Sequence, residues 1–330
     1  MRKAFFTPLV LAGALLLAGT GCATSKGDAA ASPEADTAAF PEPVTVTNCG
    51  QDITVEAAPQ RIVSMNDHVT EVLLELGLGD RIVGMGYGDA TPLPEYADQW
   101  EKIPALAAEY PTMEQLLDVD PDLVVGGMSS AFNEKEGRSR DAFAQHEIDI
   151  FLFTEYCSEE AFSLDMLATD YTQLGQLTGT EPAAEELVAD VRGDMTEIAD
   201  QVGGAEPVPT FAYDSGEKEV LTVGVVGIGH LIVENAGGEN LFADGARPYS
   251  KTTWEQVAER APEAIVVLDY GDSTAEQKIQ VLKDQPLMQT TPAVQNDRFV
   301  VVPLDDFFES PRMIGSSRTV AEFLHPDLMA

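Results

Sequence analysis

The chain has 330 residues, of which 56 are acidic and 19 are basic, so its formal net charge at neutral pH is −37. Such a charge repels the phosphates of nucleic acid, and we expect no nucleic-acid partner. The charge mainly favours solubility, because physiological salt screens charges that lie more than about 8 Å apart.

The N-terminus has the pattern of a secretion signal. Two basic residues precede an apolar run over residues 4–18, which is shorter than the roughly 20 residues that a membrane-spanning helix needs. Small residues then lead to Cys22, which we expect to carry a lipid. Lipoprotein signals usually have Leu where this chain has Gly19, so an ordinary secreted protein is the alternative. We predict a signal peptide over residues 1–21 and a lipid-anchored protein on the outer face of the cytoplasmic membrane.

Residues 22–43 contain Ala, Ser, Thr, Asp, Glu and Pro with almost no large apolar residue. This composition cannot offset the entropy cost of ordering, so it predicts a flexible tether.

The other two cysteines, Cys49 and Cys157, are expected to form a disulfide bond, since disulfides persist outside the cytoplasm. The bond would close a loop of about 108 residues and contribute on the order of 4 kcal/mol to stability. Two separately buried thiols are the alternative.

Beyond the tether, Val- and Ile-rich runs alternate with segments of helical period, which indicates βαβ units and parallel sheets. Four runs of the first half have the composition of short buried strands: residues 61–65, 81–85, 122–126 and 149–153. Asn66 and Asp67 can cap a helix after the first strand, and Gly77 would end that helix. Thr112 is expected to cap a second helix that runs to Leu117.

From residue 159 to 203, apolar residues recur at helical spacings with no strand signal, and Pro182 marks a break or the start of a second helix. Strand signals then return at residues 210–213, 264–269 and 298–302. We therefore predict an N-terminal α/β lobe over residues 44–158, a helical connector over 159–203 and a C-terminal α/β lobe over 204–330.

The two predicted lobes share an internal repeat. Residues 112–125 contain a capping Thr, a Glu in the first helical turn, a proline seven residues after that Glu, and a buried strand. Residues 253–267 contain the same features in the same order, and the two glutamates are Glu114 and Glu255. Two lobes of the same construction that face each other across a cleft would explain the repeat.

Several other segments can be compared with known protein families by their order along the chain. They are Ala58-Pro59-Gln60-Arg61-Ile62-Val63, Thr70-Glu71, Leu76-Gly77, Pro121-Asp122-Leu123-Val124, Ala236-Gly237-Gly238-Glu239-Asn240-Leu241-Phe242 and Ser310-Pro311-Arg312. In order and spacing they resemble the ABC-transporter binding proteins for iron-siderophores and cobalamin, a family of periplasmic binding proteins. The resemblance covers essentially the whole mature domain. It implies two Rossmann-like lobes joined by a single long connecting helix, with the ligand cleft between them. It also implies a binding protein rather than an enzyme, whose partner is the permease of an ABC importer.

By the same resemblance, Glu114 and Glu255 match a pair of glutamates, one per lobe, that engage arginines on the permease. Two carboxylates on rigid helices would set the orientation and the encounter rate of docking. The alternative is that each Glu complements the dipole of its own helix. The resemblance also implies a bulky metal-containing ligand and no covalently bound cofactor. A ferric siderophore is the first expectation, and haem or cobalamin are the alternatives.

In open α/β sheets, ligands bind beyond the carboxyl ends of strands and between lobes. In the N-terminal lobe this rule selects Met65, Asn66, Asp67, His68, Tyr87, Met128, Ser129, Ser130, Phe132 and Tyr156. In the C-terminal lobe it selects Tyr213, Asp214, His230, Arg247, Tyr249, Tyr270, Phe307, Phe308 and Arg312. Aromatic residues beside a few polar groups suit a large chelate or macrocycle. The arginines could hold its negative charge, and surface ion pairs are their alternative.

His68 and His230 each begin the first helix of their predicted lobe. They can face one another in a metal site, or each can cap its helix or make a polar contact in the cleft. A dedicated metal site is not expected, because the chain has only four histidines and no tight ligand cluster.

A secreted α/β hydrolase is the alternative from another functional class. The sequence contains neither a Gly-x-Ser-x-Gly motif nor a His-Glu-x-x-His motif, so the characteristic nucleophile elbow and zinc-protease helix are both missing.

Overall fold

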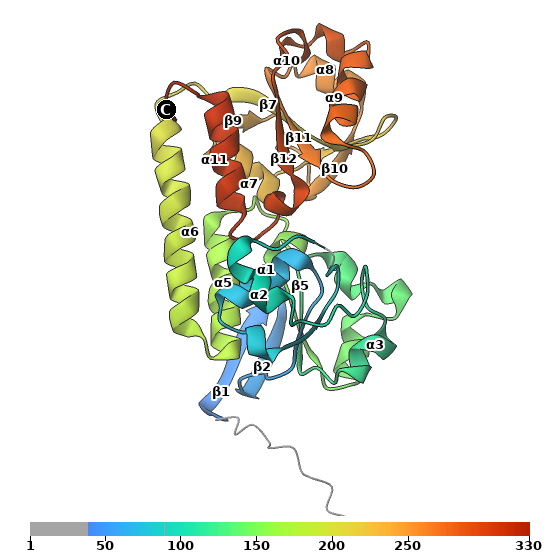
Figure 1. Ribbon diagram of the computed structural model, residues 1–330, viewed down its shortest axis with the longest axis vertical. Coiled ribbons are helices and arrows are strands. Elements are labelled where there is room, and N and C mark those ends of the chain that lie inside the picture. The colour runs from blue at the N-terminus through green and yellow to red at the C-terminus, as the bar shows by residue number, and fades with distance from the viewer. Residues whose placement is uncertain (1–38, 89) are drawn as a thin grey trace, which may run out of the picture. The chain divides into compact units, whose positions relative to one another are not determined.

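The computed structural model describes residues 39–88 and 90–330 (Figure 1). The predicted signal peptide, Cys22 and most of the predicted tether lie outside these residues. The last part of that tether does not fit the prediction, because β1 (Ala39–Asn48) begins within it. Phe40 packs against the buried core, so this segment has an apolar anchor that an argument from average composition overlooks.

A hairpin that the sequence analysis missed opens the described chain. β1 pairs antiparallel with β2 (Gln51–Ala57), and Cys49 and Gly50 form the turn with φ angles of 51° and 74°. Positive φ at both positions is what a tight two-residue hairpin turn requires. Alternating apolar residues on both strands were the available signal. The predicted disulfide bond from Cys49 to Cys157 is confirmed, and it ties this turn to the segment after β6.

The first large sheet is parallel, with strand order β4-β3-β5-β6. Its strands are β3 (Ile62–Ser64), β4 (Ile82–Met85), β5 (Leu123–Gly126) and β6 (Asp149–Leu152). The helices between them are α1 (Asp67–Glu75), α2 (Ala97–Trp100), α3 (Met113–Asp118) and α4 (Arg140–Ala144). The four predicted strands are all present, and their near-continuous burial is typical of a parallel sheet covered on both faces.

Of the helix caps predicted at Thr112 and at Asn66, the structure contains the first and not the second. Thr112 caps α3 and forms a reciprocal capping box with Gln115. Asn66 occupies the cap position of α1, but its side chain caps nothing there. Its Oδ1 instead accepts a hydrogen bond of 3.0 Å from the backbone N–H of Gly127, just beyond β5. The Asn66 side chain therefore links the ends of two neighbouring strands.

The second sheet is mixed, with strand order β10-β8-β7-β11-β12 and β9 paired to β7. Its strands are β7 (Val208–Ser215), β8 (Val220–Val223), β9 (Gly238–Asn240), β10 (Tyr249–Thr252), β11 (Ala264–Asp269) and β12 (Phe299–Pro303). β7, β11 and β12 are parallel and correspond to the three predicted strands, whereas β8 pairs antiparallel with both of its neighbours, β7 and β10. The sequence analysis missed β8, β9 and β10. β9 (Gly-Glu-Asn) and β10 (Tyr-Ser-Lys-Thr) lack the Val and Ile residues by which strands of similar length were located in the first sheet.

Helices around the second sheet complete the fold. They are α7 (Ile228–Asn235), α8 (Trp254–Glu259), α9 (Ala275–Asp284), α10 (Pro292–Gln295) and α11 (Met313–Leu324). The described residues, 39–88 and 90–330, all belong to one compact unit. The boundaries of the two predicted lobes therefore remain a prediction.

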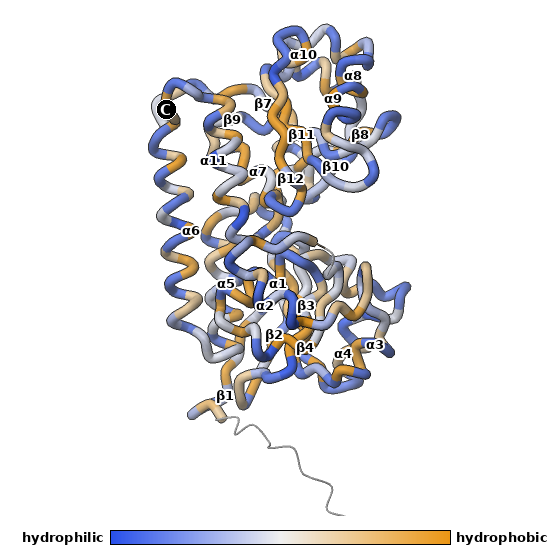
Figure 2. Tube along the Cα trace, in the orientation of Figure 1, coloured by the Kyte–Doolittle hydropathy of each residue, from blue (hydrophilic) through white to orange (hydrophobic). Residues whose placement is uncertain are grey.

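The predicted connector contains two helices, α5 (Leu164–Thr178) and α6 (Glu181–Val202). Gly179 ends α5 in the left-handed conformation, and Pro182 lies in the first turn of α6, where its missing N–H costs nothing. Figure 2 shows α6 alternating between apolar and polar residues along its length. Its buried side chains recur every three or four residues, and α6 packs against α5, α7 and α11. At about 1.5 Å per residue, its 22 residues make a rod roughly 33 Å long.

Candidate functional site

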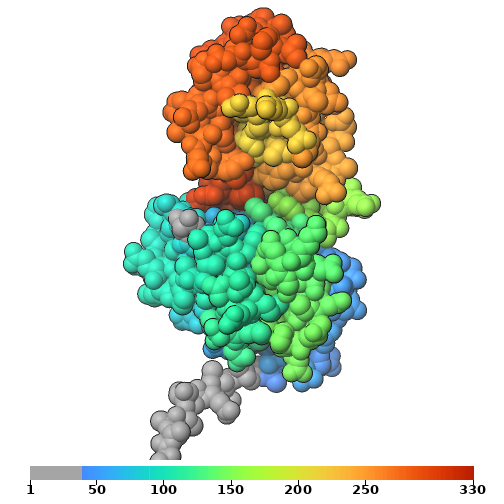
Figure 3. Space-filling model, turned by 90° about the vertical axis from the view of Figure 1, so that its right-hand side faces the viewer, coloured from blue at the N-terminus to red at the C-terminus, as the bar shows by residue number. Residues whose placement is uncertain are grey.

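A cavity of about 410 Å³, here called the central cavity, lies where strands of both large sheets end. Figure 3 shows the surface hollowed at this level. The cavity is lined by Asn66, Asp67, Tyr87, Ala90, Met128, Asp269, Tyr270, Gly271, Leu304, Asp305 and Phe308. These residues follow β3, β4 and β5 of the first sheet and end or follow β11 and β12 of the second. The cavity thus lies where the carboxyl-end rule places ligands.

A second cavity of about 530 Å³, here called the flank cavity, also takes residues from both halves of the chain. It is lined by Ser129, Glu155, Tyr156, Cys157, Ser158, Glu159, Val226, Ala246, Arg247, Pro248 and Tyr249. Ten of the predicted cleft residues line one or the other of these two cavities. Asn66, Asp67, Tyr87, Met128, Tyr270 and Phe308 line the central cavity, whereas Ser129, Tyr156, Arg247 and Tyr249 line the flank cavity.

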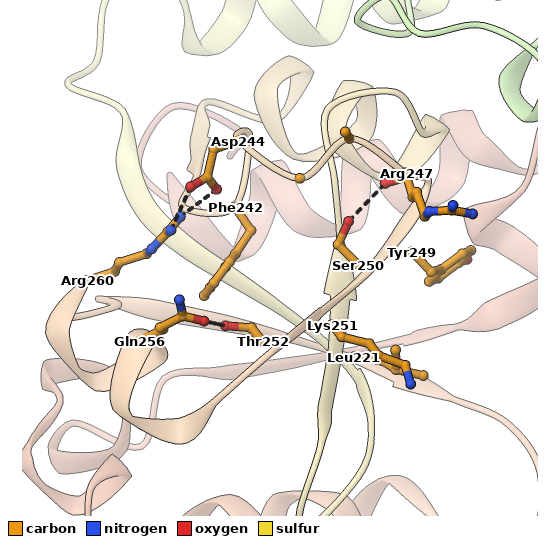
Figure 4. A pocket seen from close by; sticks show the side chains of 12 residues that line it. Leu221, Phe242, Asp244, Arg247, Tyr249, Ser250, Lys251, Thr252, Gln256 and Arg260 are labelled. Carbon is orange, nitrogen blue, oxygen red and sulfur yellow. Dashed lines mark hydrogen bonds and ion pairs between the residues drawn. The ribbon is translucent and has the colours of Figure 1, made fainter.

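A third cavity, of about 630 Å³, lies beside the start of α8 and is shown in Figure 4. Arg260 stacks over the Phe242 ring at 4.2 Å and forms a two-pronged ion pair with Asp244, with hydrogen bonds of 2.8 and 2.7 Å. Arg247 and Tyr249 lie on the other side of this third cavity, and both also line the flank cavity. The Arg260 charge is thus already paired within the protein.

Two residues predicted for the cleft are core residues. Met65 and Phe307 are fully buried, and neither lines either cavity of the cleft. Phe307 packs over Gly229, where an added Cβ would come within 2.9 Å of the ring. Both residues are near a strand end, but their side chains point into the core.

Four more predicted cleft residues are engaged by protein groups and line neither the central nor the flank cavity. The Tyr213 hydroxyl donates to the Gly216 carbonyl, and Asp214 accepts hydrogen bonds from Ser215 and Tyr270. The remaining two are Ser130, which shares a hydrogen bond with Tyr110, and Phe132, which packs edge-on against Phe143.

The two histidines have separate partners. The His68 ring is buried, stacks on Phe308 with 4.6 Å between ring centroids, and lies 3.3 Å from the Asp67 carboxylate. The ring occupies space that a side chain at position 127 would fill, so Gly127 is required there. His230 lies 3.3 Å from the Asn240 amide, and burial lowers its pKa. Among residues 39–88 and 90–330, no group of three or more His, Cys, Asp or Glu side chains could hold a metal ion.

Sequence reasoning missed two acids of the central cavity, Asp269 and Asp305. Asp269 is the last residue of β11, and Asp305 follows β12. The rule that selected Tyr270 applies equally to both, so their signal was present in the sequence. Burial raises the pKa of Asp305, and the nearby charge of Asp67 raises it further.

Arg312 forms a buried ion pair instead of lining the central cavity. Its Nε donates to Glu71 Oε2 at 2.7 Å, and its Nη2 donates to Glu71 Oε1 at 2.5 Å and to the Thr91 carbonyl at 2.6 Å. Asp306 lies 3.4 Å away, and Glu71 is only 1% exposed. Burial alone would lower the pKa of Arg312, but Glu71 and Asp306 raise it. The pair joins α1 to the segment before α11. Arg312 therefore has a structural role, where the sequence analysis expected a contact with the ligand.

Three acids are buried together near the flank cavity. Glu155 accepts a hydrogen bond of 3.0 Å from the N–H of Ile228 at the start of α7, and burial raises its pKa to about 8. Asp170 accepts two hydrogen bonds from Thr154, and burial raises its pKa to about 7. Glu309 is fully buried, and its pKa is raised by burial and by the nearby charge of Asp170. These acids favour the protonated form in the folded protein.

The two repeated glutamates lie at equivalent places. Glu114 is in the first turn of α3 behind its Thr112 cap, and Glu255 is in the first turn of α8 behind Thr253. Both side chains are exposed. The repeat seen in the sequence therefore produces two outward-facing carboxylates on capped helices.

A family model described as periplasmic binding protein matches residues 62–305. The chain belongs to this family. The substrate-binding lipoprotein YvrC of Bacillus subtilis, an ABC-transporter protein described as uncharacterized, is 26% identical over 99% of this chain and 98% of its own length. A vitamin B12-binding protein of Vibrio campbellii is 26% identical over 62% of this chain and 70% of its own length.

Solved structures of periplasmic binding proteins share the fold. An ABC-type Fe3+-hydroxamate transport protein from Saccharomonospora viridis has a TM-score of 0.72 and 23% identity, covering 86% of this chain and 99% of its own. As in these periplasmic binding proteins, two α/β halves meet at a cleft. In the described part of the chain, no helix combines the length and apolar composition needed to cross a bilayer.

Replacing Arg312 with Ala should destabilise the protein strongly. The change leaves the buried Glu71 carboxylate without its partner, and breaking such a pair typically costs about 3–5 kcal/mol. The matched control is Arg318→Ala on the same helical segment, whose exposed contact with Glu197 spans 4.0 Å and should contribute less than about 1 kcal/mol. Urea unfolding of both variants measures the difference. Equal losses of stability would contradict the structural role of Arg312.

The buried acids predict that stability falls as pH rises. Their folded-state pKa values lie above the unfolded values, so the stability they contribute is complete below about pH 4 and is lost as pH rises through about 7 and 8. Glu309→Gln removes one titrating group and should flatten the decline, raising stability near pH 9 by on the order of 1 to 3 kcal/mol.

Calorimetry between about pH 5 and pH 9 measures this effect. The control is Glu185→Gln, an exposed position on α6, which should leave the pH profile unchanged. A Glu309→Gln profile parallel to that of the unaltered protein would refute the assignment.

Proposed function

We propose that this protein is the extracytoplasmic substrate-binding lipoprotein of an ABC importer. It would capture a bulky metal-containing small molecule in the central cavity and present it to the permease. The observation that carries the proposal is the central cavity itself, which takes its lining from strand ends of both sheets. Family membership and the name of the Bacillus subtilis relative support it. Cys22 would carry the lipid that tethers the protein to the outer face of the cytoplasmic membrane.

A ferric siderophore is the first candidate ligand, as the hydroxamate-transport structure suggests. A corrinoid is the second, because relatives such as the Vibrio campbellii protein are named for vitamin B12. Tyr87, Tyr270 and Phe308 give the cavity an aromatic lining that suits the broad face of either kind of molecule. Haem is the third candidate. The ligand is cargo in each case, not a resident cofactor.

Ligand capture would involve only a small closing movement. α6 packs along α5 and α11, and the Arg312–Glu71 pair joins α1 to the segment before α11. Either link would have to break or bend before the two sheets could separate widely. Rigid elements of this kind favour small motions over a loose hinge.

A hydrolase has little support from the site. Ser129 lines the flank cavity and Ser215 donates to Asp214. In residues 39–88 and 90–330, neither serine forms a hydrogen bond with a histidine, as an activated nucleophile would.

The ligand can be identified by native mass spectrometry of the protein purified from its own cells, followed by thermal unfolding with the candidates. A metal-containing molecule should copurify and raise the melting temperature. A protein that neither carries nor is stabilised by any chelate, corrinoid or haem would refute the proposal.

Glu114→Ala combined with Glu255→Ala should abolish ligand uptake by cells while leaving ligand affinity unchanged. The two exposed carboxylates would act as a pair of docking points, which set the orientation on the permease and lie outside the ligand cavities. Radiolabelled uptake and calorimetric affinity are the two readouts. The control pair is Glu185→Ala and Glu263→Ala, also exposed acids. Normal uptake by the first pair would show that these glutamates do not dock.

A further inference from the structure

The acidic side chains that line the central cavity have no basic counterpart in its lining. They are Asp67, Asp269 and Asp305, and none of the described residues that line this cavity is Lys or Arg. The charge of Asp67, together with burial, raises the pKa of Asp305, as expected for two carboxyl groups that line the same cavity. A ligand that brought further carboxylates would increase this repulsion.

The cations nearest to this cavity are already occupied by protein groups. Arg312 is held by Glu71 and by Asp306. The Lys278 ammonium donates to two backbone carbonyls, those of Asp214 and Leu268, and lies 3.8 Å from the centre of the Tyr270 ring. Neither side chain lines the central cavity. Lys278 lines an adjoining cavity of about 550 Å³ that shares Tyr270 and Gly271 with it, but the Lys278 ammonium is engaged there by the two carbonyls and the Tyr270 ring.

The flank cavity has one cationic lining residue, Arg247, beside Glu155 and Glu159. Arg247 is exposed, as Asp269 is in the central cavity, so solvent screens both of these charges. The cleft as a whole therefore has an excess of carboxyl groups over cations. This excess is local to the lining and is separate from the charge of the outer surface.

The aromatic rings and the carboxylates of the lining both favour a ligand that presents cationic or N–H groups. Tyr87, Tyr270 and Phe308 contribute aromatic rings, whose faces carry partial negative charge and attract cations. The Asp67, Asp269 and Asp305 carboxylates accept hydrogen bonds from N–H groups and cannot donate when ionised. A complementary ligand presents amides or amines at its edge.

We propose that the cleft selects an uncharged or cationic metal complex with amide or amine groups at its periphery, and that it rejects complexes with free carboxylates. The inference rests on the proposed function, because it names the ligand class of the same cavity. Three hydroxamates balance the charge of Fe(III), so ferric hydroxamates belong to the selected class. Corrinoids with intact amide side chains also belong to it. Haem, with its propionates, and ferric citrate do not.

The test compares ligands that share one scaffold and differ in charge. Ferrioxamine B, which has a free amine, is paired with its N-succinyl derivative, which ends in a carboxylate. Cyanocobalamin is paired with its monocarboxylic acid. Calorimetry on the mature protein at low salt should show binding at least about tenfold weaker for the carboxylate member of whichever pair binds. Added salt should reduce that difference.

Variants of the cavity lining test whether its carboxylates cause the preference against carboxylate ligands. Asp269→Asn with Asp305→Asn should bring the two members of the pair to within about threefold of each other, since two of the three repelling carboxylates are removed. Asp200→Asn is the matched control, because Asp200 is exposed and lines none of the cavities described. It should keep the full preference.

Two results would overturn the inference: a carboxylate derivative that binds as tightly as its partner, or a charge preference that survives in the Asp269 and Asp305 double variant. Binding of no member of either pair, nor of haem or ferric citrate, would instead refute the proposed function, and the inference with it. Tight binding of haem or ferric citrate alone would leave the proposed function standing and refute only the ligand class.

Discussion

Parallel strands all end at the same edge of their sheet, and this constraint decides where the central cavity of the protein lies. β3, β4 and β5 end on one side of the central cavity, and β11 and β12 end on the other. Side chains as distant in the chain as Asp67 and Asp305 therefore meet around one space. The strands hold their backbones rigidly, while the loops that carry the side chains are free to differ between relatives.

Buried charges link the elements around the two sheets. The Arg312–Glu71 pair and the hydrogen bond from Ile228 to Glu155 each join residues far apart in the sequence. Taking a charged group out of water costs free energy, and a buried acid avoids much of that cost by staying protonated. Such contacts add little net stability compared with apolar packing, but they fix geometry because their partners must be aligned. In this protein they lie beside the cleft, where alignment of the two halves matters most.

Proteins similar to this chain are named for chemically different ligands. The chain is 26% identical over 62% of its length to a protein named for vitamin B12, and it shares its fold with one named for ferric-hydroxamate transport. The sheets and helices are thus compatible with chemically different cargo, and discrimination has to come from the cavity lining. In this chain the lining combines aromatic rings with three aspartates. Local charge at the cleft therefore carries more information about the ligand than the net charge of −37.

Local rules of chain geometry were enough to predict much of the structure. Strand composition located all four strands of the first sheet, Thr112 was identified as a cap, and the pairing of Cys49 with Cys157 followed from the compartment. The repeat around Glu114 and Glu255 predicted two similar exposed helix starts. β9 was missed because its residues are Gly, Glu and Asn, whereas the equally short β3 was located by its Ile and Val.

The tertiary structure decided which side chains near a strand end face the cavity. Phe307 and Phe308 are adjacent in sequence, yet the first is in the core and the second lines the central cavity. Arg312 looked available for a ligand until the fold placed it against Glu71, 241 residues away. The sequence by itself determined the strands that surround the central cavity and the edge at which that cavity forms, because these follow from neighbouring residues. Only the folded chain assigned each side chain its partner, because direction and contact depend on residues that are distant in sequence.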